Sequence, residues 1–502
     1  MRPSASVDTK NFAAHLVLEK AAQWPERTAA RCEGRALSYA ALASQSFAMA
    51  AFLRSHDLGP GSRALIVLPD SFSFLVTFLG CLLAGIVAVP VNNRLRRTDY
   101  VQCIQGCEPA LVLASEGHEA LGAAQEANVP AQVLDDGRLS GLLEGMGPSP
   151  VHPSRGDDVC VLFVTSGTTG HPKMVPHRHA DFFSMADAMG KFLGFRPQDV
   201  VLCSAKMCHV YGLAISLTLP FRVGAVTILD PGKPNPENTL RQLLDAQVTV
   251  LASVPAFYTL FLLAVPQLSQ LGHLRICFSG GEAMPAAVSS EWHKRTGHQI
   301  WQGYGSTEVM TFVIGAEPPD IVPGTAGRVL PPFELRILNP DGLAVPDGTP
   351  GHLAVRGPST MSGYWNNPEW TRRVFTADGW LLTGDMAVRE RGIYTILGRM
   401  DDMFKAGGLW VSPTRVESVL LTHSAVAQCA VTSGTVGAFS TVRAHVMLKP
   451  GWEPCPDLAN TLRRHAAGDL PDFMVPAEVV FRPALPMTAT GKVQRFILRT
   501  MD

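Results

Sequence analysis

The sequence has no excess of charge of either sign. Its 502 residues include 42 lysines and arginines and 43 aspartates and glutamates, so the formal net charge is -1 at pH 7. Binding to nucleic acids or acidic membranes draws on a surplus of basic residues, because phosphate groups are anionic. The composition offers no such surplus, and we expect neither a nucleic acid nor a membrane as a partner.

A cysteine framework is also missing. The ten cysteines form no CxxC pair and no regular spacing, which disfavours a disulfide scaffold. Cys208 and His209 are adjacent, but no further Cys/His cluster accompanies them, so a metal pair is disfavoured. The stretch "MRPSASVDTKNFAAHLVLEK" contains no secretory apolar core. We therefore expect reduced thiols and a cytoplasmic location.

One charge-free stretch is long enough to span a membrane. It runs from Phe72 to Val91, "FSFLVTFLGCLLAGIVAVPV". Gly85 is typical of a helix end, and the apolar residues Ile86 to Val89 are typical of a buried strand. We therefore predict a buried helix over Ser71 to Ala84 followed by a strand, instead of a membrane span.

Helical and strand patterns alternate through the first part of the chain. Helices are expected at Ser38 to Leu53 and Ser71 to Ala84, and strands at Ala64 to Leu68 and Ile86 to Val89. This alternation is typical of an α/β domain. The Gly-, Pro- and Asp-rich stretch from Asn128 to Asp158 is expected to be an irregular connection. At this length, two or more domains are expected.

The pattern of predicted secondary structure changes twice toward the end of the chain. From Gly324, "ELRILNPDGLAVPDGTPGHLAVRG" predicts a β-rich subdomain with tight turns. After "GRMDDMFKAGG" the pattern restarts with helix Pro413 to Leu421, strands Ala427 to Val431 and Val442 to Leu448, helix Leu458 to Ala467 and strand Glu478 to Phe481. We predict an α/β fold with a large N-terminal α/β domain, residues 1–400, and a small mobile C-terminal α+β lobe, residues 401–502.

A candidate phosphate loop lies in "VLFVTSGTTGHPKMVPHRH", Val161 to His179. After a predicted strand it offers hydroxyl groups, unobstructed backbone N–H groups at Gly167 and Gly170, and the cation of Lys173. The spacing is not that of a Walker A loop, which has four residues between its glycines and no proline before the lysine. Taken alone, the stretch is also compatible with an ordinary Ser/Thr/Gly surface loop.

Five further motifs follow this loop in order. They are "FSGGEAMP" (278–285), "WQGYGSTEVM" (301–310), "WLLTGD" (380–385), "GRMDD" (398–402) and "PMTATGKVQR" (486–495). Together with the loop, they make nearly the whole chain resemble the adenylate-forming superfamily of acyl-CoA synthetases, carrier-protein adenylation domains and luciferases. The stretches "SAKMCHVYGLAISLTLPFRVGA", "GPSTMSGYWNNPE" and "GKVQRFILR" are most similar to its benzoate-CoA ligase branch.

The resemblance implies an ATP-dependent ligase with two half-reactions. A carboxylate attacks the α-phosphate of ATP to give acyl-AMP and pyrophosphate, and the thiol of CoA then displaces AMP. Because the first transition state gathers negative charge on the phosphates, hydrogen-bond donors, a lysine and Mg²⁺ are expected to stabilise it. ATP, Mg²⁺ and coenzyme A are the implied cofactors, and a monomer or homodimer is expected.

The resemblance also assigns the nucleotide site. The ATP- and AMP-binding residues would be Thr165, Ser166, Gly167, Thr168, Thr169, Lys173, Gly281, Glu282, Tyr304, Asp385 and Arg399. The catalytic residues would be Lys492, Thr307, Glu308 and His209. Glu308 is the expected Mg²⁺ ligand, since it offers a hard oxygen. His209 matches a position between the acyl pocket and the CoA tunnel, although a core histidine is the alternative.

The remaining assignments concern the acid, the hinge and CoA. The aryl pocket would be lined by Val210, Tyr211, Gly212, Ser279, Gly280, Gly303, Met310 and Thr311. Asp401 matches the hinge about which the small lobe turns between half-reactions. Lys405, Gly407 and Gly408 match the loop on the CoA side, but the bulky pair Leu409-Trp410 departs from the usual family pattern.

Several acids and acceptors fit the resemblance. We expect benzoate or a benzoate with a hydrogen-bonding group, such as 2-aminobenzoate or a hydroxybenzoate, because Ser279 and Thr311 add hydroxyls to an apolar pocket. A medium-chain fatty acid is the alternative substrate, and a carrier-protein thiol in trans is the alternative acceptor. A degenerate binding protein is disfavoured because the catalytic and nucleotide motifs are intact.

Overall fold

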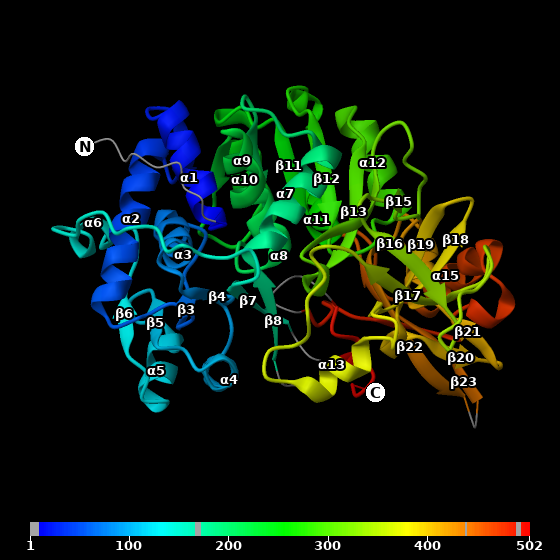
Figure 1. The fold of residues 1–502 in the computed structure, drawn as a ribbon. Coiled ribbons are helices and arrows are strands. Elements are labelled where there is room, and N and C mark those ends of the chain that lie inside the picture. Colours follow the sequence, from blue (N-terminus) through cyan, green and yellow to red (C-terminus); the bar gives the residue numbers. More distant parts are fainter. Residues whose placement is uncertain (1–9, 166–171, 437–438, 488–492, 502) are drawn as a thin grey trace.

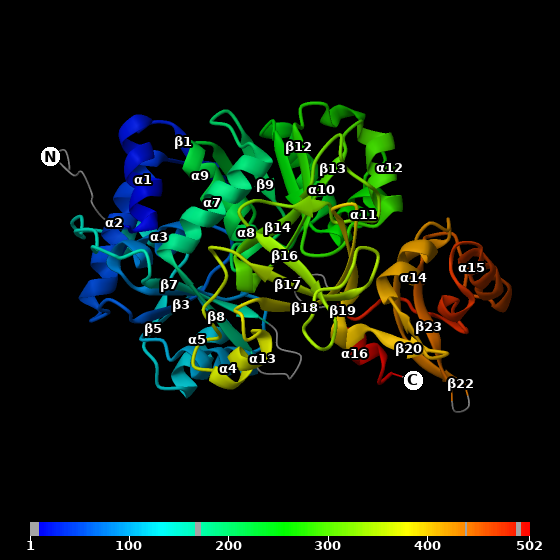
Figure 2. The same ribbon diagram turned by 45° about the vertical axis from the view of Figure 1, so that its right-hand side comes forward.

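The computed structural model describes residues 10–165, 172–436, 439–487 and 493–501. A large N-terminal domain contains three of the sheets, and a smaller C-terminal domain contains the rest (Figures 1 and 2). This arrangement confirms the α/β fold with a small α+β lobe. The boundary between residues 400 and 401 remains a prediction; Asp401 lies in the 3₁₀ turn Met400–Asp402, which joins the last strand of the large domain to the lobe.

The largest sheet has nine strands. In spatial order they are β15 (Arg328–Val329), β14 (Thr311–Ala316), β13 (Ile300–Ser306), β12 (Ile276–Gly280), β11 (Val250–Ser253), β9 (Val200–Cys203), β10 (Val226–Leu229), β1 (Thr28–Cys32) and β2 (Arg35–Ser38). The strands from β13 to β1 are parallel, and antiparallel strands close both edges. The carboxyl ends of β11, β12 and β13 therefore meet along one edge, where ligands of open α/β sheets usually bind.

A second sheet carries the candidate phosphate loop. Its order is β6 (Ala131–Val133), β5 (Leu111–Ala114), β3 (Arg63–Val67), β4 (Val87–Pro90), β7 (Val159–Thr165) and β8 (Lys173–Arg178). Strands β7 and β8 are antiparallel, and Thr165 pairs with Lys173. The predicted strand at Val161 to Val164 is confirmed, and Lys173 is thereby fixed at the first position of β8.

Helices fill the space between these two sheets and cover their outer faces. They are α1 (Phe12–Gln23), α2 (Tyr39–Ser55), α3 (Phe72–Ala84), α4 (Arg97–Cys107), α5 (Glu119–Glu126), α6 (Leu139–Leu142), α7 (His179–Leu193), α8 (Val210–Leu213), α9 (Leu219–Val223), α10 (Pro236–Asp245), α11 (Pro255–Ala264) and α12 (Ala286–Thr296). One apolar core joins side chains of α1, α2, α3 and α7 to side chains of both sheets. These helices therefore form a shared layer that fixes the two sheets relative to one another.

The charge-free stretch forms a buried helix and a buried strand, as predicted. All 13 residues of α3 are buried, Ser71 caps its first turn by accepting from the Phe74 backbone N–H, and Gly85 ends it at φ 78°. Only a residue that tolerates positive φ fits that last position well. In the described part of the chain, no helix is long and apolar enough to cross a membrane.

The prediction of an irregular connection from Asn128 to Asp158 is partly wrong. The segment contains β6, which pairs in parallel with β5 at the sheet edge, and the short helix α6. A three-residue edge strand has no periodic pattern of its own. Its backbone groups adopt a strand because β5 offers partners, which is a tertiary cause.

The β-rich subdomain and the small lobe agree with the sequence prediction. The subdomain is an antiparallel sheet of β16 (Glu334–Leu338), β17 (Gly351–Arg356), β18 (Leu381–Glu390) and β19 (Ile393–Arg399), with α13 (Pro368–Val374) alongside. The lobe contains β20 (Phe404–Ala406), β21 (Leu409–Val411), α14 (Pro413–Leu420), β22 (Val426–Val436), β23 (Phe439–Leu448), α15 (Pro456–Asp469), β24 (Glu478–Phe481) and α16 (Arg495–Leu498). A separate apolar cluster holds the lobe together.

Candidate active site

Three predicted nucleotide residues from different strands form one connected group. The hydroxyl of Tyr304, on β13, donates to Asp385 Oδ2 on β18 at 2.6 Å. The other carboxylate oxygen of Asp385 lies 3.3 Å from Nε of Arg399, at the end of β19. Burial, reinforced by the Asp385 charge, raises the pKa of Tyr304 well above its ordinary value, so the phenol stays a neutral donor. The charge of Asp385 raises the pKa of Arg399.

The segment that carries Thr307 and Glu308 is fixed at its backbone. It forms a 3₁₀ turn, Thr307–Val309, directly after β13. The Thr307 carbonyl accepts from His177 Nε2 at 2.7 Å, and the Glu308 carbonyl accepts from the Met361 backbone N–H at 2.8 Å. Anchors from two other parts of the chain therefore hold this turn before any ligand arrives, which reduces the cost of ordering it later.

The carboxylate of Glu308 has an aromatic hydrogen-bond partner. The hydroxyl of Tyr364 donates to Glu308 Oε1 at 3.0 Å, and burial is the main cause that raises the pKa of this phenol. In the described residues no group of three or more His, Cys, Asp and Glu side chains could hold a metal ion by itself. A single carboxylate fits Mg²⁺, because this ion usually keeps its waters and takes further ligands from substrate phosphates.

Lys173 points its ammonium at aromatic rings. Its Nζ lies 3.4 Å from the centre of the Trp370 ring and 5.3 Å from that of Tyr364. Burial lowers the pKa of Lys173, while the carboxylates of Glu308 and Asp401 act in the opposite direction. The predicted phosphate lysine, the predicted metal ligand and the predicted hinge are thus near enough to influence one another electrostatically.

The predicted aryl pocket is built around three aromatic rings that contact one another edge to face. Tyr211 lies 5.9 Å from Phe278 and 5.5 Å from Phe312, and the last two rings are 4.9 Å apart, all edge to face. A Cβ atom on Gly280 would come within 2.7 Å of the Phe312 ring, and one on Gly303 within 2.8 Å. Glycine is required at both positions because the Phe312 ring lies against the backbone of β12 at Gly280 and of β13 at Gly303.

Two hydroxyls accompany these rings. Ser279, on β12, and Thr311, on β14, are buried, and neither hydroxyl has a hydrogen-bond partner among the described residues. A buried polar atom without a partner is costly, typically by about 1–3 kcal/mol. Such atoms are expected where a ligand supplies the missing partner. Met310 is also buried and adopts φ 59°, which turns the chain from Glu308 into β14.

His209 begins a short helix at the edge of this region. Its backbone carbonyl accepts from the Leu213 N–H at 2.9 Å, and α8 continues into a π-helical turn, Ala214–Thr218. A Cβ on Gly212 would lie 2.1 Å from the Lys206 carbonyl oxygen. Because Gly212 has no side chain, the first turn of α8 can pack directly against the preceding loop. Val210 is buried in the same turn.

A buried carboxylate anchors that loop. Asp70 Oδ1 accepts from the Met207 backbone N–H at 3.0 Å, and Lys206 Nζ lies 3.9 Å from the other oxygen. Burial raises the pKa of Asp70 from 3.8 to about 6, although the Lys206 charge opposes the shift. Asp70 thus fixes the backbone just ahead of His209.

The Asp70 pKa leads to a testable pH dependence. Between pH 3.8 and about 6 the folded protein retains a proton that the unfolded chain releases, so the free energy of unfolding falls as pH rises, by about 3 kcal/mol in total. Asp70→Asn should remove this component while keeping the acceptor for the Met207 N–H. Thermal unfolding midpoints of both proteins at pH 4.5 and 7 test this, with Asp341→Asn in an exposed turn as control. Parallel pH curves would contradict the assignment.

Not every predicted residue joins the group. Lys405 lies on the hairpin of β20 and β21, with its ammonium 5.1 Å from the Trp410 ring centre, and Gly407 and Gly408 form the turn at φ 57° and 82°. Figures 1 and 2 show β20 within the small lobe, near β23. Leu409 and Trp410 are half exposed on the same hairpin. None of the contacts described above joins the predicted CoA-side residues Lys405, Gly407 and Gly408 to Tyr304, Asp385 and Arg399.

Other predicted residues border the group or lie outside the described chain. Thr165 ends β7. Gly281 and Glu282 follow β12 with Gly281 at φ 91°, and the charge of Glu282 contributes to the raised pKa of Arg495 in the small lobe. Ser166, Gly167, Thr168, Thr169 and Lys492 fall outside the described residues. Arg495, three positions after Lys492, is therefore near enough to Glu282 of the large domain to interact with it electrostatically.

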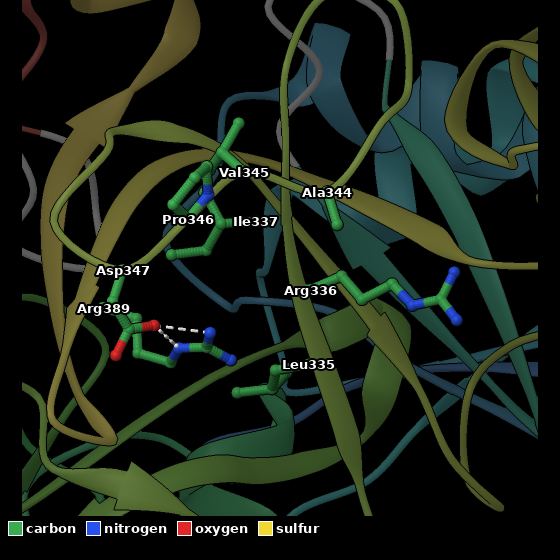
Figure 3. A pocket seen from close by; sticks show the side chains of 8 residues that line it. All are labelled: Leu335, Arg336, Ile337, Ala344, Val345, Pro346, Asp347 and Arg389. Atoms are coloured by element: carbon green, nitrogen blue, oxygen red, sulfur yellow. Dashed lines mark hydrogen bonds and ion pairs between the residues drawn. The ribbon is translucent and has the colours of Figure 1, made fainter.

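A small pocket elsewhere is unrelated to this group. It lies in the β-rich sheet, measures about 60 Å³ and is lined by Leu335, Arg336, Ile337, Ala344, Val345, Pro346, Asp347 and Arg389 (Figure 3). Figure 3 shows Asp347 paired with Arg389 at one side of it. Ligand pockets usually measure on the order of 300–1,000 Å³. Its size and its lack of predicted site residues exclude it as the substrate site.

The sequence interpretation missed several residues of the site. Tyr364 and Trp370 contact Glu308 and Lys173, and Phe312 forms one wall of the aromatic group. The stretch "GYWNNPEW" did offer a signal, because aromatic residues in a Gly- and Asn-rich loop seldom serve only a turn. Nothing in the local pattern, however, indicates which cation or carboxylate those rings would meet.

Comparisons with known proteins agree with this geometry. Residues 17–365 match the family described as AMP-binding enzyme, and residues 415–492 match the AMP-binding enzyme C-terminal domain. The chain is 35% identical over 457 residues to a benzoate–CoA ligase of Thauera aromatica, which covers 88% of this chain and 86% of that protein.

Two solved structures are also similar. One is a benzoate CoA ligase from Burkholderia xenovorans LB400, with a TM-score of 0.92, 32% identity and coverage of 97% of this chain and 99% of that chain. The other is the anthranilate CoA ligase AuaEII in complex with anthranoyl-AMP, with a TM-score of 0.92, 30% identity and coverage of 97% and 96%.

Proposed function

Because this chain belongs to the AMP-binding enzyme family, we propose that it is an ATP-dependent aryl-CoA ligase that activates benzoate or a substituted benzoate. The first half-reaction joins the acid to the α-phosphate of ATP and releases pyrophosphate. The second transfers the aroyl group to the thiol of coenzyme A and releases AMP. The relatives named above act on aromatic acids of this kind, as their names state.

The observation that carries the proposal is the position of the aromatic group. Tyr211, Phe278 and Phe312 offer ring edges and faces to a flat apolar ligand. Strand β13 connects this group to the nucleotide residues, because Gly303 packs under Phe312 and the next residue, Tyr304, bonds to Asp385. An aromatic acid held there would present its carboxylate toward the nucleotide.

The chain's own side chains divide the first half-reaction among themselves. We assign the ribose hydroxyls to Asp385 and Arg399 and the adenine to the Tyr304 ring. The Lys173 loop would bind the β- and γ-phosphates, with Thr307 at the α-phosphate. Glu308 would hold Mg²⁺, which when bound neutralises charge on the leaving pyrophosphate. Tyr304, Asp385, Arg399 and the turn with Thr307 and Glu308 are held by the contacts described above, so these groups need little reorganisation as charge develops.

The small lobe supplies the remaining parts of the proposal. Lys492 would bridge the attacking carboxylate and the α-phosphate, and rotation about Asp401 would then bring the hairpin with Lys405, Gly407 and Gly408 to the site. We propose 401–502 as the moving unit. A cytoplasmic location is also proposed, because the ten cysteines are all free and nine of them are buried.

The identity of the acid and of the acceptor is open to direct measurement. Pyrophosphate release should be recorded for benzoate, 2-aminobenzoate, hydroxybenzoates and medium-chain fatty acids, each with and without CoA. The proposal expects release with an aromatic acid and aroyl-CoA formation when CoA is added. Activity on fatty acids alone would overturn the aryl assignment. Aroyl-AMP that transfers to a carrier-protein thiol but not to CoA would overturn the assignment of the acceptor.

Thr311 should discriminate between substituted and plain benzoate. If its unpartnered hydroxyl meets a polar ring substituent, Thr311→Val should lower kcat/KM for the substituted acid by about tenfold or more and spare benzoate. Thr77→Val is a matched control, because the Thr77 hydroxyl is likewise buried and unpartnered but lies in α3. Equal losses on both acids would contradict this role for Thr311.

A further inference from the structure

The indole ring of Trp370 lies unusually close to a candidate phosphate-binding cation. Lys173 Nζ is 3.4 Å from the ring centre, well within the distance of about 6 Å at which a cation is attracted to an aromatic face. The ring of Tyr364 lies 5.3 Å from the same nitrogen. Two aromatic faces therefore stabilise this ammonium.

Trp370 has no evident structural reason to be where it is. Helix α13 contains no buried residue, and Trp370 is half buried and absent from the apolar clusters of the described chain. Its position is nevertheless fixed, since its backbone N–H donates to the Asn367 side chain at 3.1 Å. Thr371 Oγ1 in the same helix accepts from the Tyr364 backbone N–H at 3.0 Å, which ties the two rings to one turn.

An aromatic ring and a carboxylate interact with a lysine in different ways. The ring face attracts the ammonium without adding negative charge and without occupying a specific N–H direction, so donors remain available to an anion. A carboxylate in the same place would repel a triphosphate. Lys173 and Tyr364 also line a hollow of about 280 Å³, so there is open volume next to the lysine.

We propose that Trp370 is a positioning residue for ATP: its ring holds the Lys173 ammonium in place for the β- and γ-phosphates, and thereby raises the affinity for ATP. Without the ring, the long lysine side chain loses its preferred direction and must be ordered by the nucleotide, which lowers the affinity for ATP. Arg373, whose guanidinium lies 4.9 Å from the same ring centre, is paired with Glu369. The pairing limits repulsion between the two cations.

The inference rests on the assignment of Lys173 under the proposed function, so the test measures binding without catalysis. Calorimetric titration of the full chain with Mg²⁺·ATP, in the absence of any acid, gives Kd for the wild type, Trp370→Leu, Lys173→Ala and the double variant. Trp370→Leu should weaken ATP binding by about three- to thirtyfold, the range from an exposed to a desolvated cation–π contact. Trp370→Phe should restore most of the affinity.

The double-mutant cycle separates positioning from a structural effect. In the Lys173→Ala background, Trp370→Leu should have no further effect on Kd, because the cation it positions is gone. Trp452→Leu, an exposed tryptophan of the small lobe, is the matched control and should not change Kd. An unchanged Kd in Trp370→Leu, or an equal loss with and without Lys173, would overturn the proposal.

Turnover gives a second readout. Trp370→Leu should raise KM for ATP but leave the conversion of supplied aroyl-AMP and CoA to aroyl-CoA within about twofold of the wild type, because no triphosphate takes part in that step. If the wild type binds ATP but activates no aromatic acid, the proposed function fails and the binding test of Trp370 still stands. The two failures are therefore distinguishable.

Discussion

Lys492→Ala should abolish most of the first half-reaction and spare the second. The resemblance places this ammonium between the attacking carboxylate and the α-phosphate, two anions that repel each other without a bridging cation. Loss of one fixed donor of this kind costs on the order of 10²–10³ in rate. In the second half-reaction the leaving group is AMP and the lobe has turned, so thioester formation from supplied aroyl-AMP should stay within about tenfold of the wild type.

The described residues next to Lys492 support this expectation. Arg495 pairs with Glu417 at 2.8 Å and lies 3.4 Å from Asp402, and its raised pKa includes a contribution from the Glu282 charge. The Glu282 contribution indicates that Arg495 lies near enough to the predicted adenine loop to interact with it electrostatically.

Single-turnover assays test the assignment of Lys492. One series starts from acid and ATP, and the other from purified aroyl-AMP and CoA. Lys449→Ala, a lysine elsewhere in the same lobe, is the control and should behave as the wild type. A folded Lys492→Ala variant with equal losses in both series would show that this lysine has been assigned to the wrong step.

Asp401→Pro should have the opposite effect to Lys492→Ala: it should spare the first half-reaction and impair the second. Proline fixes φ and removes a backbone donor, so the lobe should be held in one orientation. Because the second half-reaction is the one expected to require the lobe to turn, aroyl-AMP should accumulate while aroyl-CoA formation falls by on the order of 10² or more.

The hinge is held by contacts that this substitution leaves in place. Arg499 donates to the Asp401 carbonyl at 3.3 Å and to the Asp402 carboxylate at 3.0 Å. Asp401→Ala is the matched control, because it removes the same carboxylate without fixing φ. Quenched-flow measurement of aroyl-AMP and aroyl-CoA in the three proteins distinguishes the outcomes. Normal aroyl-CoA turnover in Asp401→Pro would show that rotation at this residue is not required.

Local patterns in the sequence were sufficient for the helices and strands that were predicted by residue range. Ser71 followed by an apolar run and then Gly85 specifies a helix with both ends marked, and the structure has that helix within one residue. The sequence after Gly324, which is rich in turn-forming residues, likewise specifies antiparallel strands. These features depend on hydrogen bonds and periodicities within a few residues, so the sequence shows them directly. Strand β6 is the exception, because its backbone pairing depends on β5, a strand from another part of the sequence.

The sequence by itself determined the fold class, the position of the candidate phosphate loop between β7 and β8 and the residue types of the predicted nucleotide site. Only the tertiary structure decided which side chains meet: Tyr304 bonds to a residue 81 positions away, and Tyr364 to one 56 positions away. It also decided that Trp370 faces Lys173 and that Gly280 and Gly303 lie under Phe312. Such contacts depend on which strands become neighbours and on how loops pack against them. No periodicity within a single segment encodes either, because the free energy that selects them comes from burial shared between distant segments.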